Sequence, residues 1–342
     1  MLTRLHHDVL DTLFGARLRT FELAAFGPRK RILPNSAVRG YIDGVTPATV
    51  HAVLEEIESR HAKHLVLDGS NLGEVARAAR QAAPDLAITT LFHNVEARFF
   101  LGSLRQEKSV HAFGVLVANY LAERKAVRHS DRLICLSERD RGLLKRVYGR
   151  AGTDVCPMAV RDALPATWPP AEQPRDGYAL FVGGSFYANR AGIQWFVRHV
   201  APRIALRTCV VGRGLENLRA ELELPGKVEV VGEVDDLAAW YAGAKVVIAP
   251  IFDGSGMKTK VAEALMFGKK VIGTPDAFAG YEAVAHEVGR TCRTADEFVA
   301  AIDDVDSFVT APFDPKMRAL YETHYSAAAY QARLKEILEA AA

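Results

Sequence analysis

The stretch that decides the fold is Pro250-Ile-Phe-Asp-Gly-Ser-Gly-Met-Lys-Thr-Lys-Val-Ala-Glu-Ala-Leu265. An apolar run at Lys245–Ala249 precedes it and predicts a buried strand, and the pattern that follows predicts a helix over Met257–Phe267. Its two glycines allow the backbone to approach a ligand closely. Free N–H groups at the start of a helix attract phosphate oxygens. The stretch therefore predicts a strand–loop–helix unit that binds an anionic group.

Two side chains of this helix suit a nucleotide. Lys260 lies in the first turn, where its ammonium reaches a diphosphate, and Glu263 follows three residues later on the same face. A carboxylate there accepts hydrogen bonds from two ribose hydroxyls. Lys258 points elsewhere and ranks lower. The alternative interpretation is a plain helix start with solvated lysines and a Glu–Lys surface pair.

Further strands in the second half also end in turns that contain glycine. Because the carboxyl ends of parallel strands share one edge, these turns and the stretch at 250–265 are expected to face one crevice. The turn at 212–217 lacks the third glycine of the dinucleotide fingerprint, which disfavours a nicotinamide enzyme. The predicted strands and turns are Tyr178–Val182 with Gly183-Gly184-Ser185, Arg207–Val211 with Gly212-Arg213-Gly214, Lys227–Val231 with Gly232 to Asp235, and Lys270–Thr274.

The first half shows the same alternation more faintly. Its predicted strands are His64–Asp68, Leu86–Phe92, Arg132–Leu136 and Asp154–Met158. The predicted helices are Leu2–Leu13, Pro47–His61, one through Val75–Arg80, and Val95–His129 with a break near Gly102 or Gly114. Those of the second half are Ala191–Val200, Leu237–Ala242 and, at the end, Ala327–Ala340, which is expected to pack back on the N-terminal lobe.

Four prolines between Ala163 and Pro174 predict an extended linker. The fold class is therefore α/β, with two Rossmann-like lobes that face a central cleft. The expected divisions are an N-terminal lobe at 1–162, a linker at 163–176, a C-terminal lobe that binds a nucleotide diphosphate at 177–325 and a C-terminal helix at 326–342.

Four ordered motifs resemble the C-terminal half of GT-B fold glycosyltransferases of the GT4 type, the group 1 glycosyl transferases. They are Leu180–Phe196, the Val211-Gly-Arg213 turn, Val231–Asp236 and Gly254–Ala264. The resemblance is strong over residues 178–282 and looser over 90–160. It implies retaining, hexosyltransferase-type transfer of a sugar from a nucleotide sugar without a bound metal or other cofactor.

The resemblance also implies roles for single residues. Gly183 and Gly184 lie against the diphosphate, Val234 touches the base, Lys260 holds phosphate and Glu263 holds the ribose. The expected catalytic residues are His93 and Lys260. The expected donor-binding set is Gly183, Gly184, Ser185, Asn189, Gly212, Arg213, Val234, Gly254, Ser255, Gly256, Met257, Lys258, Thr259, Lys260 and Glu263, and the expected acceptor or cleft set is Asn94, Glu96, Ser137 and Glu138.

The cleft assignments have plainer alternatives. A lone histidine such as His93 can be structural, and Ser137 can be the N-cap of the helix that follows it. The chain also departs from the family pattern. Ser255 stands where many members have a glutamate, and residues 184–190 offer only Arg190 as a cation. Lys260 is therefore expected to neutralise most of the diphosphate charge, with Lys258 or Arg190 contributing the rest. The chain begins with a helical pattern instead of a strand and glycine-rich loop. Two explanations remain: the start of the chain is truncated, or the N-terminal lobe is reduced.

The function expected is transfer from a UDP- or GDP-linked sugar to a glycan or lipid-linked glycan, as in polysaccharide biosynthesis. One alternative is a non-catalytic nucleotide-sugar-binding GT-B subunit. Another is a GT-B nucleotide-sugar epimerase, for which only His93 and Glu96 are candidates for handling protons.

Charge and composition suggest where the protein works. Residues 1–170 carry 24 Lys and Arg against 18 Asp and Glu, a net +6, whereas the rest carries 19 against 23, a net −4. The basic half, with Arg29-Lys30-Arg31, Arg124, Lys125 and Arg128, suits an acceptor at an anionic membrane surface, and an ordinary solvated surface is the alternative interpretation. The four cysteines are scattered, and no apolar run is long enough to cross a membrane. We expect a cytoplasmic protein, peripheral on the inner membrane face, that binds no nucleic acid.

Overall fold

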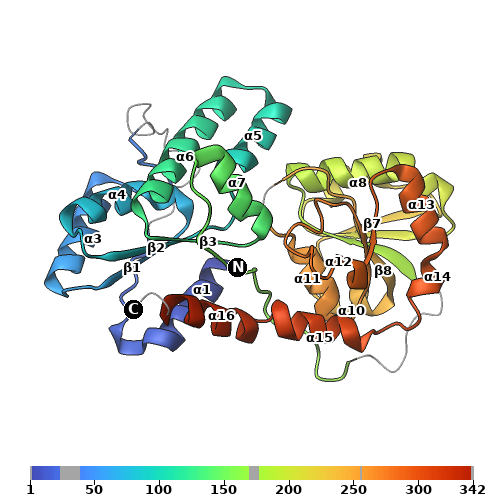
Figure 1. Cartoon of the computed structure of the whole chain (residues 1–342). Helices are drawn as coiled ribbons and strands as arrows, with labels where there is room; N and C mark the ends of the chain where they lie inside the picture. The colour runs from blue at the N-terminus through green and yellow to red at the C-terminus, as the bar shows by residue number, and fades with distance from the viewer. Residues whose placement is uncertain (1, 24–38, 169–176, 255, 340–342) are drawn as a thin grey trace. The chain divides into compact units, whose positions relative to one another are not determined.

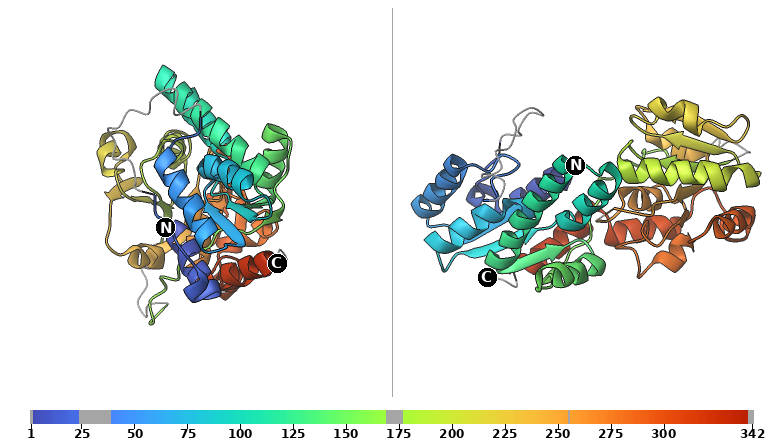
Figure 2. Two further views of the ribbon diagram at one scale, coloured as in Figure 1. Left: turned by 90° about the vertical axis from the view of Figure 1, so that its left-hand side faces the viewer. Right: turned by 90° about the horizontal axis from the view of Figure 1, so that it is seen from above.

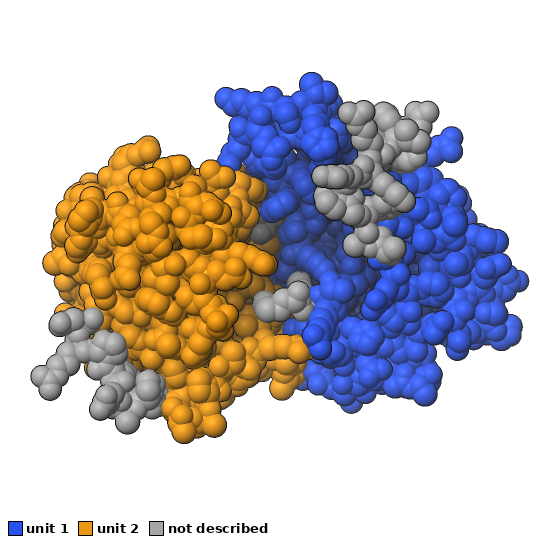
Figure 3. Space-filling view, turned by 180° about the vertical axis from the view of Figure 1, so that it is seen from behind, with its two compact units in different colours: residues 1–157, 331–342 blue, residues 158–330 orange. Residues whose placement is uncertain are grey.

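The computed structural model describes residues 2–23, 39–168, 177–254 and 256–339. The chain contacts divide it into two compact units, coloured separately in Figure 3. Unit 1 comprises residues 1–157 and 331–342, and unit 2 comprises residues 158–330. The division falls a few residues before the predicted end of the first lobe at 162. Of the predicted linker, residues 169–176 lie outside the described residues.

Unit 1 contains a sheet of four parallel strands in the order β1-β2-β3-β4. The apolar runs predicted these strands to within a few residues, and the first matches its prediction at both ends. Their bounds are β1 His64–Asp68, β2 Ala87–Leu91, β3 Arg132–Cys135 and β4 Asp154–Val155.

Helices pack around this sheet, and α4 lies against α6 in the views of Figures 1 and 2. The two helices approach so closely at Gly73 that a Cβ there would sit 1.9 Å from the carbonyl oxygen of Ala122. Only glycine fits at that position. The bounds are α1 Leu2–Phe14, α3 Pro47–Ser59, α4 Gly73–Ala82, α5 Glu96–Glu107, α6 Val110–His129 and α7 Glu138–Tyr148.

The long helix expected over Val95–His129 is interrupted, but not at either glycine. Lys108 ends α5 in the left-handed conformation with φ of +47°, and the Ser109 side chain caps α6 by accepting a hydrogen bond from the Ala112 N–H. Gly102 and Gly114 lie inside α5 and α6. The predicted position of the break was therefore wrong, because the serine cap outweighs the helix-weakening effect of the glycines.

Unit 2 contains six parallel strands in the order β10-β9-β8-β5-β6-β7. The chain moves outward from β5 through β6 to β7, then returns to β8 on the other side of β5. The order therefore reverses between β5 and β8. The predicted strands are confirmed to within a residue at each end, but β10 was missed. The bounds are β5 Tyr178–Val182, β6 Thr208–Val211, β7 Val228–Gly232, β8 Ala244–Ala249, β9 Val271–Gly273 and β10 Gly289–Thr291.

The helix that carries Lys260 and Glu263, α11, ends as predicted. Gly268 follows it with φ of +66°, and the Lys269 N–H donates to the Ala264 carbonyl at 2.8 Å. The last helix, α16, begins in unit 2, and from Gln331 onward it belongs to unit 1. The bounds are α8 Tyr187–His199, α9 Arg219–Leu222, α10 Leu237–Gly243, α11 Thr259–Met266, α12 Ala285–Val288, α13 Ala295–Asp303, α14 Val305–Phe308, α15 Pro315–His324 and α16 Ala327–Glu339.

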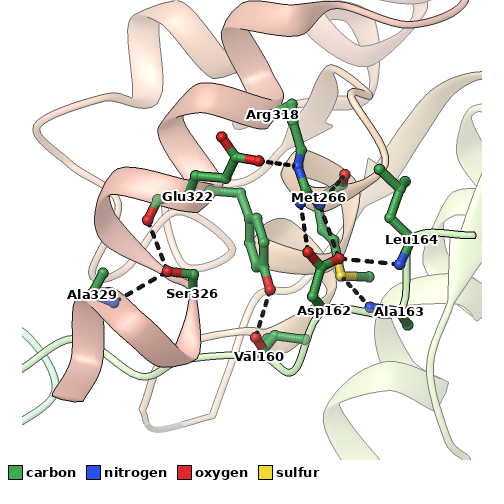
Figure 4. A network of polar contacts seen from close by, with 10 residues as sticks. Val160, Asp162, Ala163, Leu164, Met266, Arg318, Glu322, Ser326 and Ala329 are labelled. Carbon is green, nitrogen blue, oxygen red and sulfur yellow. Dashed lines mark hydrogen bonds and ion pairs between the residues drawn. The ribbon is translucent and has the colours of Figure 1, made fainter. Parts of the chain in front are cut away.

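The first residues of unit 2 are tied to α11 and α15 by the polar network of Figure 4. Arg318 of α15 donates to the Asp162 carboxylate at 2.9 Å and to the Met266 carbonyl at 3.3 Å. The Tyr321 hydroxyl donates to the Val160 carbonyl at 2.8 Å. This network fixes the C-terminal end of α11. No helix in the described part of the chain is both long enough and apolar enough to span a membrane.

Candidate functional site

In unit 2 the strand order reverses between β5 and β8, and a loop follows the carboxyl end of each of these strands. The turn at Gly183-Gly184 follows β5, and the stretch at 250–258 connects β8 to α11. Open parallel sheets bind ligands outside such a switch point, because the loops on its two sides diverge. The prediction that these loops share one sheet edge is confirmed, since all the strands pair in parallel.

The turns at this switch point are packed so tightly that they require glycine. A Cβ on Gly212, which has φ of +142°, would lie 2.1 Å from the Gly183 carbonyl oxygen. A Cβ on Gly183 would lie 2.6 Å from the side-chain nitrogen of Asn189. Side chains are thereby excluded, and the backbone is left available to a ligand.

Lys260 is a buried cation of this region. Its side chain is in the first turn of α11, is 5% exposed, and lies 4.1 Å above the centre of the Phe181 ring. The ammonium donates a 2.9 Å hydrogen bond to the amide oxygen of Asn189, and the Asn189 amide nitrogen donates to the Gly184 carbonyl at 2.8 Å. Asn189 therefore connects Lys260 to the glycine turn.

The electrostatics of Lys260 are unusual for a lysine. Burial lowers the pKa of Lys260 to about 7, the charge of Glu263 opposes this, and the charge of Lys258 adds to it. An anion beside the ammonium would favour its protonated form. The interpretation of Lys260 and Glu263 as a solvated surface pair is wrong, because the packing of α11 against the sheet buries Lys260 and leaves Glu263 only partly exposed.

Glu263 has a partner that sequence reasoning missed. The Tyr241 hydroxyl donates to the Glu263 carboxylate over 3.4 Å, and the Tyr241 ring stacks on Phe267 with centres 4.4 Å apart. Burial raises the pKa of Glu263, while the Lys260 charge and the Tyr241 hydrogen bond oppose the rise. Tyr241 lies in α10, and no local motif distinguishes it from an ordinary core residue.

The remaining donor candidates lie around these groups in different ways. The Lys258 ammonium turns back to the Gly256 carbonyl at 2.8 Å, and Arg213 is exposed beside Glu233. Gly254 has φ of +116°, and Met257 is buried. Ser255 lies outside the described residues. Five further residues are partly or fully exposed, namely Gly184, Ser185, Arg190, Val234 and Thr259.

In unit 1, His93 follows β2 and contacts the end of β1. Its Nε2 lies 2.6 Å from Oδ1 of Asp68, and Nδ1 of His6, from α1, lies 2.5 Å from the same oxygen. Burial alone would raise the pKa of Asp68, but the hydrogen bonds from His6 and His93 outweigh it and hold this pKa well below its usual range. Sequence reasoning found His93 but not its partners. Asp68 could have been noticed as a polar residue that ends a strand.

Within the described ranges, these three residues are also the group whose side chains could hold a metal ion. The ligand atoms of His6, Asp68 and His93 all lie within 4.8 Å of one another. Two imidazoles and a carboxylate form a donor set that divalent transition metals accept. Independence of metal stays a prediction.

The loop after His93 is held by a buried carboxylate, Glu123 of α6. Glu123 accepts the N–H groups of Glu96 at 2.9 Å and Ala97 at 3.1 Å, so it caps α5 from a neighbouring helix. It also accepts the Ser70 hydroxyl at 2.9 Å and the Tyr148 hydroxyl at 2.6 Å. Burial and the charge of Glu123 raise the pKa of Glu96 to about 8. Glu123 was missed because it lies in mid-helix without a motif.

Two further cleft candidates, Ser137 and Glu138, lie at the start of α7. The Ser137 side chain accepts the Asp140 N–H at 3.1 Å, which confirms its interpretation as a helix cap. Glu138 is exposed and pairs with Arg141 at 3.2 Å. Among the basic residues, Lys125 is paired with Glu74 at 2.6 Å, while Arg29-Lys30-Arg31 lies outside the described residues.

Comparisons with known proteins agree with this architecture. Residues 177–311 match the sequence model of the family Glycosyl transferases group 1. No curated protein matches the chain.

Solved structures resemble the whole chain. A sucrose-phosphate synthase from Thermosynechococcus elongatus is 18% identical, with a TM-score of 0.68 over 95% of this chain and 84% of that one. HepE of Anabaena, solved with UDP, is 15% identical, with a TM-score of 0.61 over 86% and 82%. The lipopolysaccharide outer core galactosyltransferase WaaB is 16% identical, with a TM-score of 0.59 over 86% and 79%. The chain therefore has the GT-B fold, with a group 1 glycosyltransferase match in unit 2.

Proposed function

Starting from a GT-B fold whose unit 2 matches the group 1 glycosyltransferases, we propose that the protein transfers a sugar from a UDP- or GDP-linked donor. The acceptor is a glycan or a lipid-linked glycan. The observation that carries the proposal is the buried Lys260, which Asn189 connects to the glycine turn beside the switch point of unit 2.

The donor is held mainly by α11 and the turns around it. The diphosphate lies at the start of α11, where Lys260 and free backbone N–H groups meet its oxygens. The ribose hydroxyls donate to Glu263, whose carboxylate is oriented by Tyr241. HepE of Anabaena has been solved with UDP and with UDP-glucose, which supports a nucleotide-sugar donor for this chain.

The reaction breaks the bond between the anomeric carbon and the diphosphate oxygen. Negative charge develops on the departing diphosphate, where Lys260 and the dipole of α11 stabilise it without a metal ion. The acceptor oxygen attacks the same face of the sugar and passes its proton to the departing phosphate, so that the configuration is retained. His93 of unit 1 is proposed to take part in the reaction. The basic residues of unit 1 supply the acceptor surface.

A thermal-shift panel of nucleoside diphosphates and their sugars, run with EDTA, tests donor binding. A ligand at 100 times its Kd stabilises by about 2.7 kcal/mol, so the panel should single out one base by a raised Tm. Absence of a shift with every nucleotide would contradict the proposal. NMR of the product anomer separates retention from inversion. Donor binding without turnover on any acceptor would favour the non-catalytic subunit.

The proposed membrane surface has its own test. Co-sedimentation with anionic but not neutral vesicles, lost at high salt, is expected if Arg124 and Arg128 of α6 contribute to attachment, because each basic residue adds about 1 kcal/mol. Failure to sediment with anionic vesicles at low salt would contradict attachment and favour a water-soluble acceptor.

A further inference from the structure

We propose that His6 and Asp68 are positioning residues that set the tautomer and orientation of His93, so that His93 presents an unprotonated Nδ1 to a substrate hydroxyl. The inference deepens the proposed function, on which the catalytic role of His93 rests. Asp68 and His6 were not part of any motif in the sequence.

The geometry singles out one oxygen atom. Oδ1 of Asp68 lies 2.6 Å from Nε2 of His93 and 2.5 Å from Nδ1 of His6. The two rings meet edge to face, with centres 5.3 Å apart and planes at 69°. Each ring comes from a different element, the loop after β2 and helix α1, and Asp68 ends β1 between them. The three groups therefore hold one another in place.

Donor and acceptor chemistry fixes the protons. One carboxylate oxygen of Asp68 faces two ring nitrogens, Nε2 of His93 and Nδ1 of His6. A carboxylate only accepts hydrogen bonds, so each ring nitrogen facing it carries the proton. Neutral His93 is thus protonated at Nε2, and its Nδ1 is left as an acceptor.

Exposure separates the two rings by role. The His6 side chain is 2% exposed, and His93 is 29% exposed. His6 is fixed by its own helix, because its neighbours Leu5, Val9 and Leu10 are also buried. His93 is thus the ring that a ligand can reach, while His6 acts on it through the Asp68 carboxylate. A hydroxyl of the sugar or of the acceptor is the group that an acceptor nitrogen recognises.

The test uses the full-length protein, prepared in EDTA, and four variants. Asp68→Asn replaces the shared carboxylate, and His6→Ala removes the donor from α1. His6→Asn keeps an N–H group close to the position of Nδ1. His7→Ala is the matched control, because His7 is the neighbouring histidine and is exposed. NMR of ¹⁵N-labelled histidine reports the tautomer of His93, and hydrolysis of UDP-glucose reports turnover.

The wild type should show the Nε2–H tautomer at His93, and Asp68→Asn should lose that preference. His6→Ala should lower kcat about 10- to 100-fold with little change in KM, because a misplaced group costs rate rather than donor affinity. His6→Asn should restore most of the rate, and His7→Ala should match the wild type.

Three results would overturn the inference. They are an Nδ1–H tautomer in the wild type, a tautomer unaffected by Asp68→Asn, and a stoichiometric transition metal that the wild type retains and His6→Ala releases. The two proposals fail separately. If the tautomer responds as expected while no nucleotide or nucleotide sugar of the thermal-shift panel binds the wild type, the proposed function is wrong and the positioning of His93 stands.

Discussion

The two units place polar clusters at comparable points of their sheets, but the clusters are built differently. In unit 2, Lys260 and Glu263 come from one continuous stretch, and glycine turns surround them. In unit 1, His6, Asp68 and His93 come from three separate elements. A stretch that carries its own loop and helix start can be recognised in sequence, whereas a cluster assembled from distant residues becomes visible only in the fold.

The electrostatics of the clusters differ as well. Lys260 donates to the neutral amide of Asn189, and burial lowers its pKa to about 7. Asp68 accepts hydrogen bonds from two histidines, which keep it ionised. An anionic ligand beside Lys260 would therefore favour its ammonium form, whereas the Asp68 carboxylate has its partners within the protein. The predictions below test this contrast.

The largest effect is expected in unit 1, at Glu123. Glu123→Ala leaves two N–H groups and two hydroxyls without their acceptor and should lower the free energy of unfolding by about 3–5 kcal/mol. Urea unfolding followed by circular dichroism measures the loss. Glu55→Ala, an exposed change on α3, should shift stability by less than about 0.5 kcal/mol. A loss below 1 kcal/mol for Glu123→Ala would show that this carboxylate does not organise unit 1.

The next effect is on ligand binding in unit 2. Lys260→Met and Glu263→Gln should each weaken UDP or GDP binding by about 1.5–3 kcal/mol, because each removes a charge-assisted hydrogen bond. Neither substitution should lower the Tm of the free protein much, because the loss of the charge also removes the free-energy cost of keeping that charge out of water. Lys258→Met should cost less affinity, because this ammonium is turned toward Gly256. Equal losses for Lys258→Met and Lys260→Met would remove the distinction between the two lysines.

A third effect follows from the low pKa of Lys260. The bound diphosphate favours the ammonium, so the pKa of Lys260 is higher in the complex than its value of about 7 in the free protein. Between these two values binding takes up a proton, and affinity should fall up to tenfold per pH unit above pH 7. Calorimetry at pH 8 in buffers of different ionisation enthalpy measures that proton. Proton uptake that persists in Lys260→Met would assign it to another group.

The smallest effect concerns Glu96 in unit 1. Its pKa of about 8 is above the ordinary 4.5, so the folded state holds a proton that the unfolded state has lost. This contribution to stability is complete below about pH 4.5 and is lost as the pH rises through 8. Glu96→Gln should therefore stay closest to the wild type at pH 5 and exceed its stability at pH 9. Urea unfolding at both pH values checks this, and identical pH dependence in the two proteins would contradict it.

The sequence predicted most of the fold, because its strands are short apolar runs bounded by glycine or proline. It missed β10, Gly289–Thr291, because Gly-Arg-Thr contains no apolar run. It misplaced the break between α5 and α6, because Ser109 caps α6 more strongly than Gly102 or Gly114 weakens a helix.

The site was predictable only where its residues are local. Asn189, Lys260 and Glu263 follow from the motifs around them. The partner of Glu263, Tyr241, and the carboxylates Asp68 and Glu123 do not, because tertiary packing alone defines their roles. His6 and Asp68 are 62 residues apart in the chain, and no spacing rule connects them.

The central claim is that unit 2 binds a nucleoside diphosphate at Lys260 without a metal ion. Isothermal titration of the full-length protein with UDP and with GDP, in buffer containing EDTA, tests it most directly, with Lys260→Met titrated in parallel. The account predicts saturable one-to-one binding of one of the two nucleotides by the wild type and a loss of about 10- to 150-fold in the variant. Binding that vanishes with the chelator, or that is equally tight in Lys260→Met, would contradict it.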